Sequence, residues 1–139
     1  MPLLSWSDKF SINVESIDTQ HRRLFELANE MYDMANTNSE KQALVRALND
    51  LLDYTVYHFQ SEERLMQEQN YPRYAAHRQV HEALTRQALD FKAKVDNGES
   101  VSARDFLKFL FDWLAKHIMD QDKKIGTYID MNKIKPLKK

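Results

Sequence analysis

The feature of the sequence that most constrains its fold is the placement of its histidines. Apolar residues recur at spacings of three and four over most of the chain, which is the period of amphipathic α-helices. In the fourth such stretch, the predicted stripe consists of Phe106, Phe109, Leu110, Trp113 and His117. All five histidines of the chain fall on or beside such stripes. Because a buried imidazole needs polar partners, the fold must bring such partners to several helices.

Turn signals divide the periodic sequence into four helical segments. The boundaries that these signals predict are a start near Asp18, a capping box of Ser39 and Gln42, a break at residues 70–72 with Pro72 in the first turn of the third helix, an end at residues 97–98, and a start at Ser102 with Asp105. Short polar connections favour antiparallel neighbours. The predicted fold is therefore an all-α, antiparallel up-down-up-down four-helix bundle.

The two ends of the chain lie outside the periodic part. Residues 1–17 show no sustained period, but Trp6, Phe10 and Ile17 are apolar enough to pack across a bundle end, so we expect an ordered N-terminal arm. Residues 133–139 form a basic tail that we expect to be solvated. With 139 residues the chain has the length of one domain, and we expect residues 1–139 to form a single one.

Composition narrows the classes of partner and of metal ligand. The 20 lysines and arginines nearly balance the 21 aspartates and glutamates, so nothing favours nucleic acid or an anionic membrane surface as a partner. Without cysteine, histidine and carboxylate are the available metal ligands. The sequence has no signal peptide pattern and no apolar run long enough to insert into a membrane. We expect a cytoplasmic monomer.

Two motifs place candidate metal ligands four residues apart. His58 precedes Glu62 by four residues, and His77 precedes His81 by four. At this spacing two side chains stand only about 40° apart around a helix, so both members of each pair can reach one site. Burying Glu62 without compensation would cost several kcal/mol, and bound cations are the natural compensation.

His21 and His117 add an imidazole from each remaining helix, and Asp120 or Asp122 adds a second carboxylate. Such a set is large for one zinc ion but suits two metal ions, because carboxylates can bridge. The five imidazole nitrogens and four carboxylate oxygens would form nine bonds to metal, and a solvent-derived bridge bonded to both ions would add two. The total is about eleven, whereas two six-coordinate ions need roughly twelve, so one position stays open. Spacing alone does not select iron.

The second carboxylate is ambiguous. On a regular helix Asp120 would stand about 60° from His117 and Asp122 about 140° away. Helical periodicity therefore favours Asp120. Asp122 would need a π-bulge or another local distortion to turn inward.

Several stretches together form a specific pattern: Trp6, residues 17–21, residues 58–63 with Met66, residues 71–72, His77 with His81, and residues 113–117 followed by Asp122. This pattern resembles the hemerythrin family, in particular its single-domain bacterial members, over nearly the whole chain. The resemblance implies two iron ions with an oxo or hydroxo bridge. It assigns one iron to His77, His81 and His117, the other to His21 and His58, and the bridging positions to Glu62 and Asp122.

The resemblance also implies a function. Dioxygen would bind reversibly, as a hydroperoxide, at the open iron of His21 and His58. An apolar wall around this iron would consist of Leu24, Phe59, Trp113 and Ile118, with Met119 near it. The protein would then be an oxygen carrier, store or sensor and not an enzyme, with dioxygen, an oxygen-consuming enzyme or a reductant as its partners.

Two other classes of function stay open. A di-iron enzyme could act on dioxygen, peroxide or nitric oxide at the same site. Ferritin-like di-iron enzymes, however, use two Glu-x-x-His motifs and two further glutamates, whereas this chain has His-x-x-x-Glu once. An iron-holding or signalling module is the third class, and the chain offers no second domain or long linker for signalling within it.

Overall fold

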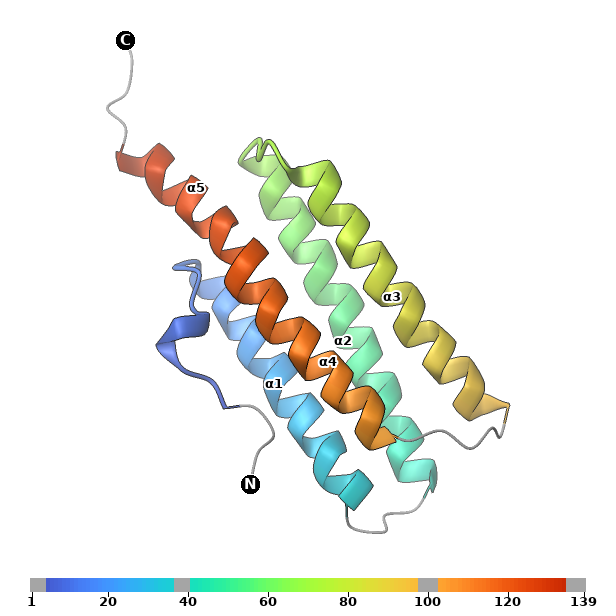
Figure 1. The fold of residues 1–139 in the computed structure, drawn as a ribbon. Coiled ribbons are helices and arrows are strands. Elements are labelled where there is room, and N and C mark those ends of the chain that lie inside the picture. The colour runs from blue at the N-terminus through green and yellow to red at the C-terminus, as the bar shows by residue number, and fades with distance from the viewer. Residues whose placement is uncertain (1–4, 37–40, 98–102, 135–139) are drawn as a thin grey trace.

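Four long helical segments run side by side, alternately up and down (Figure 1). The computed structural model describes residues 5–36, 41–97 and 103–134. Its elements are the 3-10 turn η1 (Asp8–Phe10), α1 (Glu15–Asn36), α2 (Lys41–Glu68), α3 (Tyr74–Asp96), α4 (Ala103–His117), the π-helical segment η2 (Ile118–Asp122) and α5 (Lys123–Ile134). Because α4, η2 and α5 follow without a break, they form one long fourth segment. The prediction of an all-α up-down-up-down bundle is confirmed.

Two helix starts differ from the predicted ones. The first helix begins at Glu15, so Asp18 is not its N-cap. Instead the Asp18 carboxylate accepts hydrogen bonds from the Ser11 hydroxyl and, at 2.9 Å, from the backbone N–H of Ile12. The third helix begins at Tyr74, so Pro72 lies in the turn before it and not in its first turn.

The predicted break after α2 and the predicted end of α3 are confirmed. Asn70 adopts a φ of 54°, which takes the chain out of the helical conformation after α2. At the other end of α3 the backbone N–H of Asn97 donates to the carbonyl of Ala93 at 2.9 Å. Ser39, Gly98 and Ser102 lie outside the described residues, so the helix caps expected there stay predictions.

The N-terminal arm is ordered over its described part, residues 5–14, while residues 15–17 belong to α1 and not to the arm. Phe10 is buried and packs edge-on against Phe25 of α1, with ring centroids 5.2 Å apart. Trp6 contacts both rings, at 5.8 and 5.5 Å. This aromatic cluster, together with the hydrogen bonds of Asp18, holds the arm on the bundle. Residues 1–4 of the arm and 135–139 of the basic tail lie outside the described part.

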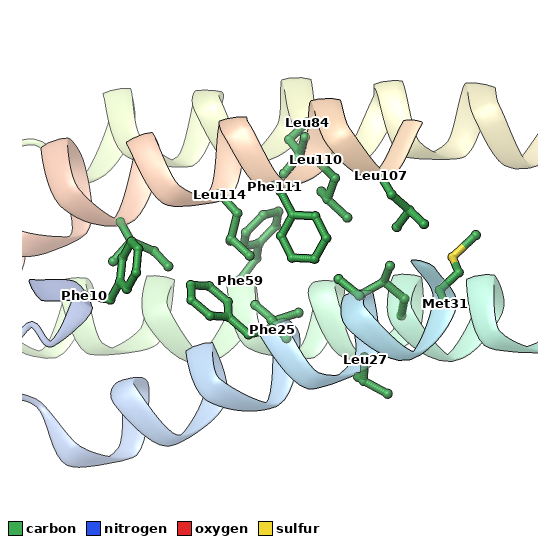
Figure 2. Packing of buried hydrophobic residues seen from close by; sticks show 14 of the residues in the cluster. Phe10, Phe25, Leu27, Met31, Phe59, Leu84, Leu107, Leu110, Phe111 and Leu114 are labelled. Carbon is green, nitrogen blue, oxygen red and sulfur yellow. The ribbon is translucent and has the colours of Figure 1, made fainter. Parts of the chain in front are cut away.

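The core face of α4 differs from the predicted stripe. Phe109 was predicted to face the core, but it is 43% exposed. The buried residues are Leu107, Leu110, Phe111 and Leu114, whose spacings of three and four form one helical face. Phe106 and Trp113 lie half-buried at its edges. Figure 2 shows Phe25, Phe59 and Leu114 pointing into the space between the helices.

Buried polar residues interrupt the apolar core. The main apolar cluster includes Leu51 of α2, and a smaller one includes Met66 of the same helix. Along α1, His21 lies between Ile17 and Leu24, which both belong to the main cluster. All the histidines are buried. The bundle therefore encloses a polar site within its apolar core. None of the described helices combines the length and the apolar character needed to cross a membrane.

Gly126 provides a test of the arm's packing. A Cβ on this residue would overlap the carbonyl oxygen of Ile12 in the arm. Alanine is favoured over glycine inside a helix by about 1 kcal/mol. Even so, we expect Gly126→Ala to lower the free energy of unfolding by about 1–3 kcal/mol, because the arm must shift. Urea denaturation measures this change. Thr127→Ala, at the exposed neighbouring position, is the control, and equal stability of the two variants would contradict the packing argument.

Candidate metal centre

Every long segment of the bundle contributes to one buried polar cluster. The contributors are His21 of α1, His58 and Glu62 of α2, His77 and His81 of α3, His117 of α4 and Asp122 of η2. The exposed fraction of these residues is 4% or less in every case. The structure therefore brings together all seven residues that the family resemblance named as ligands.

Glu62 lies at the centre of the cluster, with its two oxygens facing different imidazoles. Its Oε1 lies 2.7 Å from Nε2 of His77 and 3.0 Å from Nε2 of His81. Its Oε2 lies 3.6 Å from Nε2 of His21 and 3.4 Å from Nε2 of His58. One carboxylate thus faces two separate sets of nitrogen atoms, which is the arrangement that a bridging ligand requires.

Asp122 repeats this arrangement. Its Oδ1 lies 3.0 Å from Nε2 of both His77 and His117, and its Oδ2 lies 3.1 Å from Nε2 of His21. The two carboxylates therefore divide the imidazoles into a group of three, His77, His81 and His117, and a pair, His21 and His58.

The π-helical segment η2 explains why Asp122 points inward. A π-helix forms hydrogen bonds between residues five apart, so residues i and i+5 share a face. His117 and Asp122 are five apart and span this segment. Asp120, which regular periodicity favoured, is exposed. Regular periodicity alone favours the wrong aspartate here, because the local distortion that Asp122 required is present.

The side chains of the cluster do not satisfy one another. Nε2 of His117 lies 3.1 Å from Nε2 of His77 and 3.3 Å from Nε2 of His81, so three nitrogen atoms converge. Nε2 of His21, Oε2 of Glu62 and both carboxylate oxygens of Asp122 are buried without a hydrogen bond of good geometry. Leaving such groups unsatisfied is costly. Two bound cations would satisfy them, and the residues present fit a pair of metal ions.

Electrostatics keeps the two carboxylates ionised. Burial alone would raise the pKa of Glu62, but the imidazoles of His21, His58, His77 and His81 around its two oxygens hold it well below its usual range. Burial and the charge of Glu62 would likewise raise the pKa of Asp122, but His117 and His21 lower it. Metal-binding carboxyl groups must be deprotonated, so this environment prepares both for cations.

The histidines respond to the same two carboxylates in different ways. Burial would lower the pKa of His21, but contacts with Asp122 and Glu62 raise it to about 9. The pKa of His77 is raised to about 9 by the same two partners, again against the effect of burial. For His58 burial dominates and the pKa is lowered. Negative charge is thus concentrated at the centre of the cluster, where cations would bind.

Two residues outside the cluster orient its imidazoles. Nδ1 of His58 donates to Oε1 of Gln20 at 2.8 Å, and Nδ1 of His81 donates to Oε2 of Glu63 at 3.0 Å. Each bond places the proton on Nδ1 and leaves Nε2 free to bind a metal. Sequence reasoning assigned no role to Gln20 or Glu63. In the sequence each of them is next to a proposed ligand, which was the one available sign of a role. Each, however, contacts a histidine of another helix, and residue spacing does not reveal such a contact.

The four residues of the predicted apolar wall lie in two settings. The Phe59 ring stacks on His81, with centroids 3.9 Å apart, and Trp113 stacks on His117 at 4.4 Å. Both therefore contact the group of three histidines, and Phe59 also lies 5.8 Å from the ring of His58. Leu24 and Ile118 are almost fully buried in the core. Met119 is 42% exposed, unlike these two buried residues.

Comparison with known proteins identifies the family. The family model described as "Hemerythrin HHE cation binding domain" matches residues 13–129. The chain belongs to the hemerythrin family. The bacteriohemerythrin of Stenotrophomonas maltophilia is 36% identical over 122 residues, which cover 88% of this chain and 78% of that relative. The bacteriohemerythrin of Methylococcus capsulatus is 36% identical over 127 residues, or 91% and 96% of the two chains.

Solved structures agree with this assignment. A crystal structure of wild-type hemerythrin superposes with a TM-score of 0.87 at 35% identity, over 91% of this chain and 98% of that one. Membership of this family, together with the two buried ligand groups, confirms the prediction of a di-iron, oxygen-binding protein.

The two aspartates of η2 provide the test of the second carboxylate. We expect Asp122→Asn to reduce iron content from two ions per chain to one or none, because the amide loses the charge that faces both groups of histidines. Asp120→Asn should retain both ions. Iron analysis of the purified variants measures this, and circular dichroism confirms that each is folded. Retention of both ions by Asp122→Asn, with loss from Asp120→Asn, would reverse the assignment.

Proposed function

We propose that this protein binds dioxygen reversibly at its iron pair and acts as an oxygen carrier, store or sensor. The observation that supports this most is the unequal division of the imidazoles, three on one side of the shared carboxylates and two on the other. With equal carboxylate contributions, the side with fewer imidazoles has a coordination position left for an external ligand.

In this proposal His77, His81 and His117 hold one iron, His21 and His58 hold the other, and Glu62 and Asp122 contact both. When bound, the iron pair supplies the electrons that dioxygen takes up and later returns. The chain's own side chains fix the positions of the nitrogen and oxygen ligands. Gln20 and Glu63 keep two of the imidazoles in the orientation that presents Nε2 to the metal.

Apolar residues would protect the open position from water and anions. Leu24 and Ile118 are 2% and 0% exposed, and Phe59 is 4% exposed. Leu24 and Phe59 also line a narrow apolar space of about 10 Å³ with Leu51, Thr55 and other residues. This volume is about the least that one water molecule needs. We include Leu24 and Phe59 in the proposed dioxygen pocket on this basis, and Trp113 and Ile118, which do not line the space, on the basis of the family resemblance.

The proposal extends to assembly and location. All seven proposed ligands come from one chain, so a monomer of one domain is sufficient to build the site. Size-exclusion chromatography tests this. The proposal also includes a cytoplasmic location. It includes a partner that either consumes the oxygen or reduces an oxidised site. Both parts rest on the sequence alone.

An oxygenation cycle tests the function directly. We expect anaerobically loaded protein to bind two ferrous ions and to develop a visible absorption band on exposure to oxygen, which disappears when oxygen is removed. Repeated cycles measured by absorption spectroscopy establish reversibility. Two irons per chain without a reversible band would contradict oxygen carriage and leave the di-iron site intact. Sustained turnover of oxygen or peroxide would instead favour the enzyme.

Trp113 tests the protective role of the pocket. Its ring covers one face of His117, and its removal opens a path for solvent. We expect Trp113→Ala to increase the rate of autoxidation of the oxygenated protein several-fold. Phe109→Ala, on the same helix at a residue that is 43% exposed, should leave this rate unchanged. Equal rates for the wild type and Trp113→Ala would remove Trp113 from the pocket.

A further inference from the structure

We propose that Glu63 is a positioning residue that holds His81 in its metal-binding orientation and makes the three-histidine side of the site the more electron-rich side. The inference rests on the proposed assignment of His77, His81 and His117 to one iron. It goes beyond that assignment because it gives the two irons different electronic surroundings.

The contact between Glu63 and His81 is direct and partly shielded from solvent. Oε2 of Glu63 accepts the Nδ1–H of His81 at 3.0 Å, and the two side chains are 21% and 2% exposed. Arg78 competes only weakly for this carboxylate, because its Nε lies 3.9 Å from Oε1 of Glu63 and 3.2 Å from Oε1 of Glu82. The imidazole is therefore the closer partner of Glu63.

The ring of His81 is held in two directions. The hydrogen bond to Glu63 lies in the plane of the imidazole and fixes its rotation within that plane. Phe59 covers one face of the ring, with an interplanar angle of 4°. These two contacts leave Nε2 of His81 one direction, toward Oε1 of Glu62.

Three of the other histidines differ from His81 at Nδ1, the ring nitrogen that faces away from the carboxylates. Nδ1 of His58 bonds to the neutral amide of Gln20, while Nδ1 of His21 and of His117 are buried without a hydrogen-bond partner. Within residues 5–36, 41–97 and 103–134, Glu63 is the one carboxylate that bonds to the outward nitrogen of a cluster histidine. The negative charge thus belongs to the side with three histidines, and the neutral amide to the side with two.

This difference has a defined electronic effect. A carboxylate that accepts the Nδ1 proton raises the basicity of the opposite nitrogen, and such partners typically affect metal affinity about 10–100-fold. A more basic ligand stabilises the ferric ion more than the ferrous ion, because the charge of the metal is higher. Partial exposure of Glu63 moderates the effect through solvent screening.

The experiment exchanges the two outer partners. Glu63→Gln keeps an acceptor for His81 but removes the charge, and Gln20→Glu adds a charge at His58. Glu82→Gln is the matched control, because Glu82 is a surface carboxylate one position from His81 that pairs with Arg78. Spectroelectrochemistry measures the reduction potential of the iron pair in each variant. ¹H–¹⁵N NMR on the zinc-loaded protein measures the chemical shift and the solvent-exchange rate of the Nδ1 proton of His81. Zinc on Nε2 keeps the proton on Nδ1, so both quantities report the partner that accepts it.

We expect Glu63→Gln to weaken the preference for ferric over ferrous iron about tenfold, which corresponds to a rise of about 59 mV for a one-electron couple. Gln20→Glu should lower the potential, and Glu82→Gln should leave it unchanged. The Nδ1 proton of His81 should move upfield and exchange faster with solvent in Glu63→Gln than in the wild type, because a neutral amide accepts it more weakly than a carboxylate.

Two results would overturn the inference. One is that Glu63→Gln and Glu82→Gln have the same reduction potential of the iron pair. This holds whether the two potentials both differ from that of the wild type or both equal it. The other is an Nδ1 proton of His81 whose chemical shift and exchange rate are the same in Glu63→Gln as in the wild type. The NMR measurement needs neither iron nor oxygen, so it tests the role of Glu63 even if the oxygenation cycle fails. Loss of the reversible band with an intact potential difference would remove the proposed function and leave this inference standing.

Discussion

The structure depends on one buried carboxylate, that of Glu62 in α2. It lies among imidazoles from α1, from α3 and from its own helix. A buried charge of this kind is tolerated only when partners surround it. Here its two oxygens face different sets of histidines, at 2.7–3.0 Å on one side and 3.4–3.6 Å on the other. The helices must therefore converge at one level, where buried polar residues interrupt the apolar core.

The second carboxylate requires a departure from regular helix. An α-helical continuation of α4 would turn Asp122 away from the cluster, and the π-helical segment η2 corrects this within five residues. The irregular hydrogen bonding of η2 is compensated by burial on both sides, since Ile118 and Ile125 are fully buried. The glycine at position 126 then lets the N-terminal arm pack closely against α5. Site and arm thus share one irregular stretch of chain.

The sequence was sufficient for what regular periodicity controls. It predicted the helices, their antiparallel order and the inward position of all five histidines. Prediction from periodicity failed where the position of a side chain depends on contacts with another part of the chain. Asp18 has the chemistry of an N-cap but bonds to the arm, and Phe109 is aromatic but lies off the buried face of α4. Periodicity also selected Asp120, because spacing alone assumes a regular helix. The contacts of Gln20 and Glu63 join different helices and have no signature in spacing.

The same contacts make the two halves of the site unequal. On the three-histidine side, Phe59 stacks on His81 and Trp113 stacks on His117. The Glu63 carboxylate also accepts a hydrogen bond from His81. The two-histidine side has a neutral amide behind His58, and Nδ1 of His21 has no hydrogen-bond partner. In the proposed function, unequal ligation would leave a position for an external ligand on the two-histidine side alone. The inequality of the two sides is therefore the property by which this bundle would serve the proposed function.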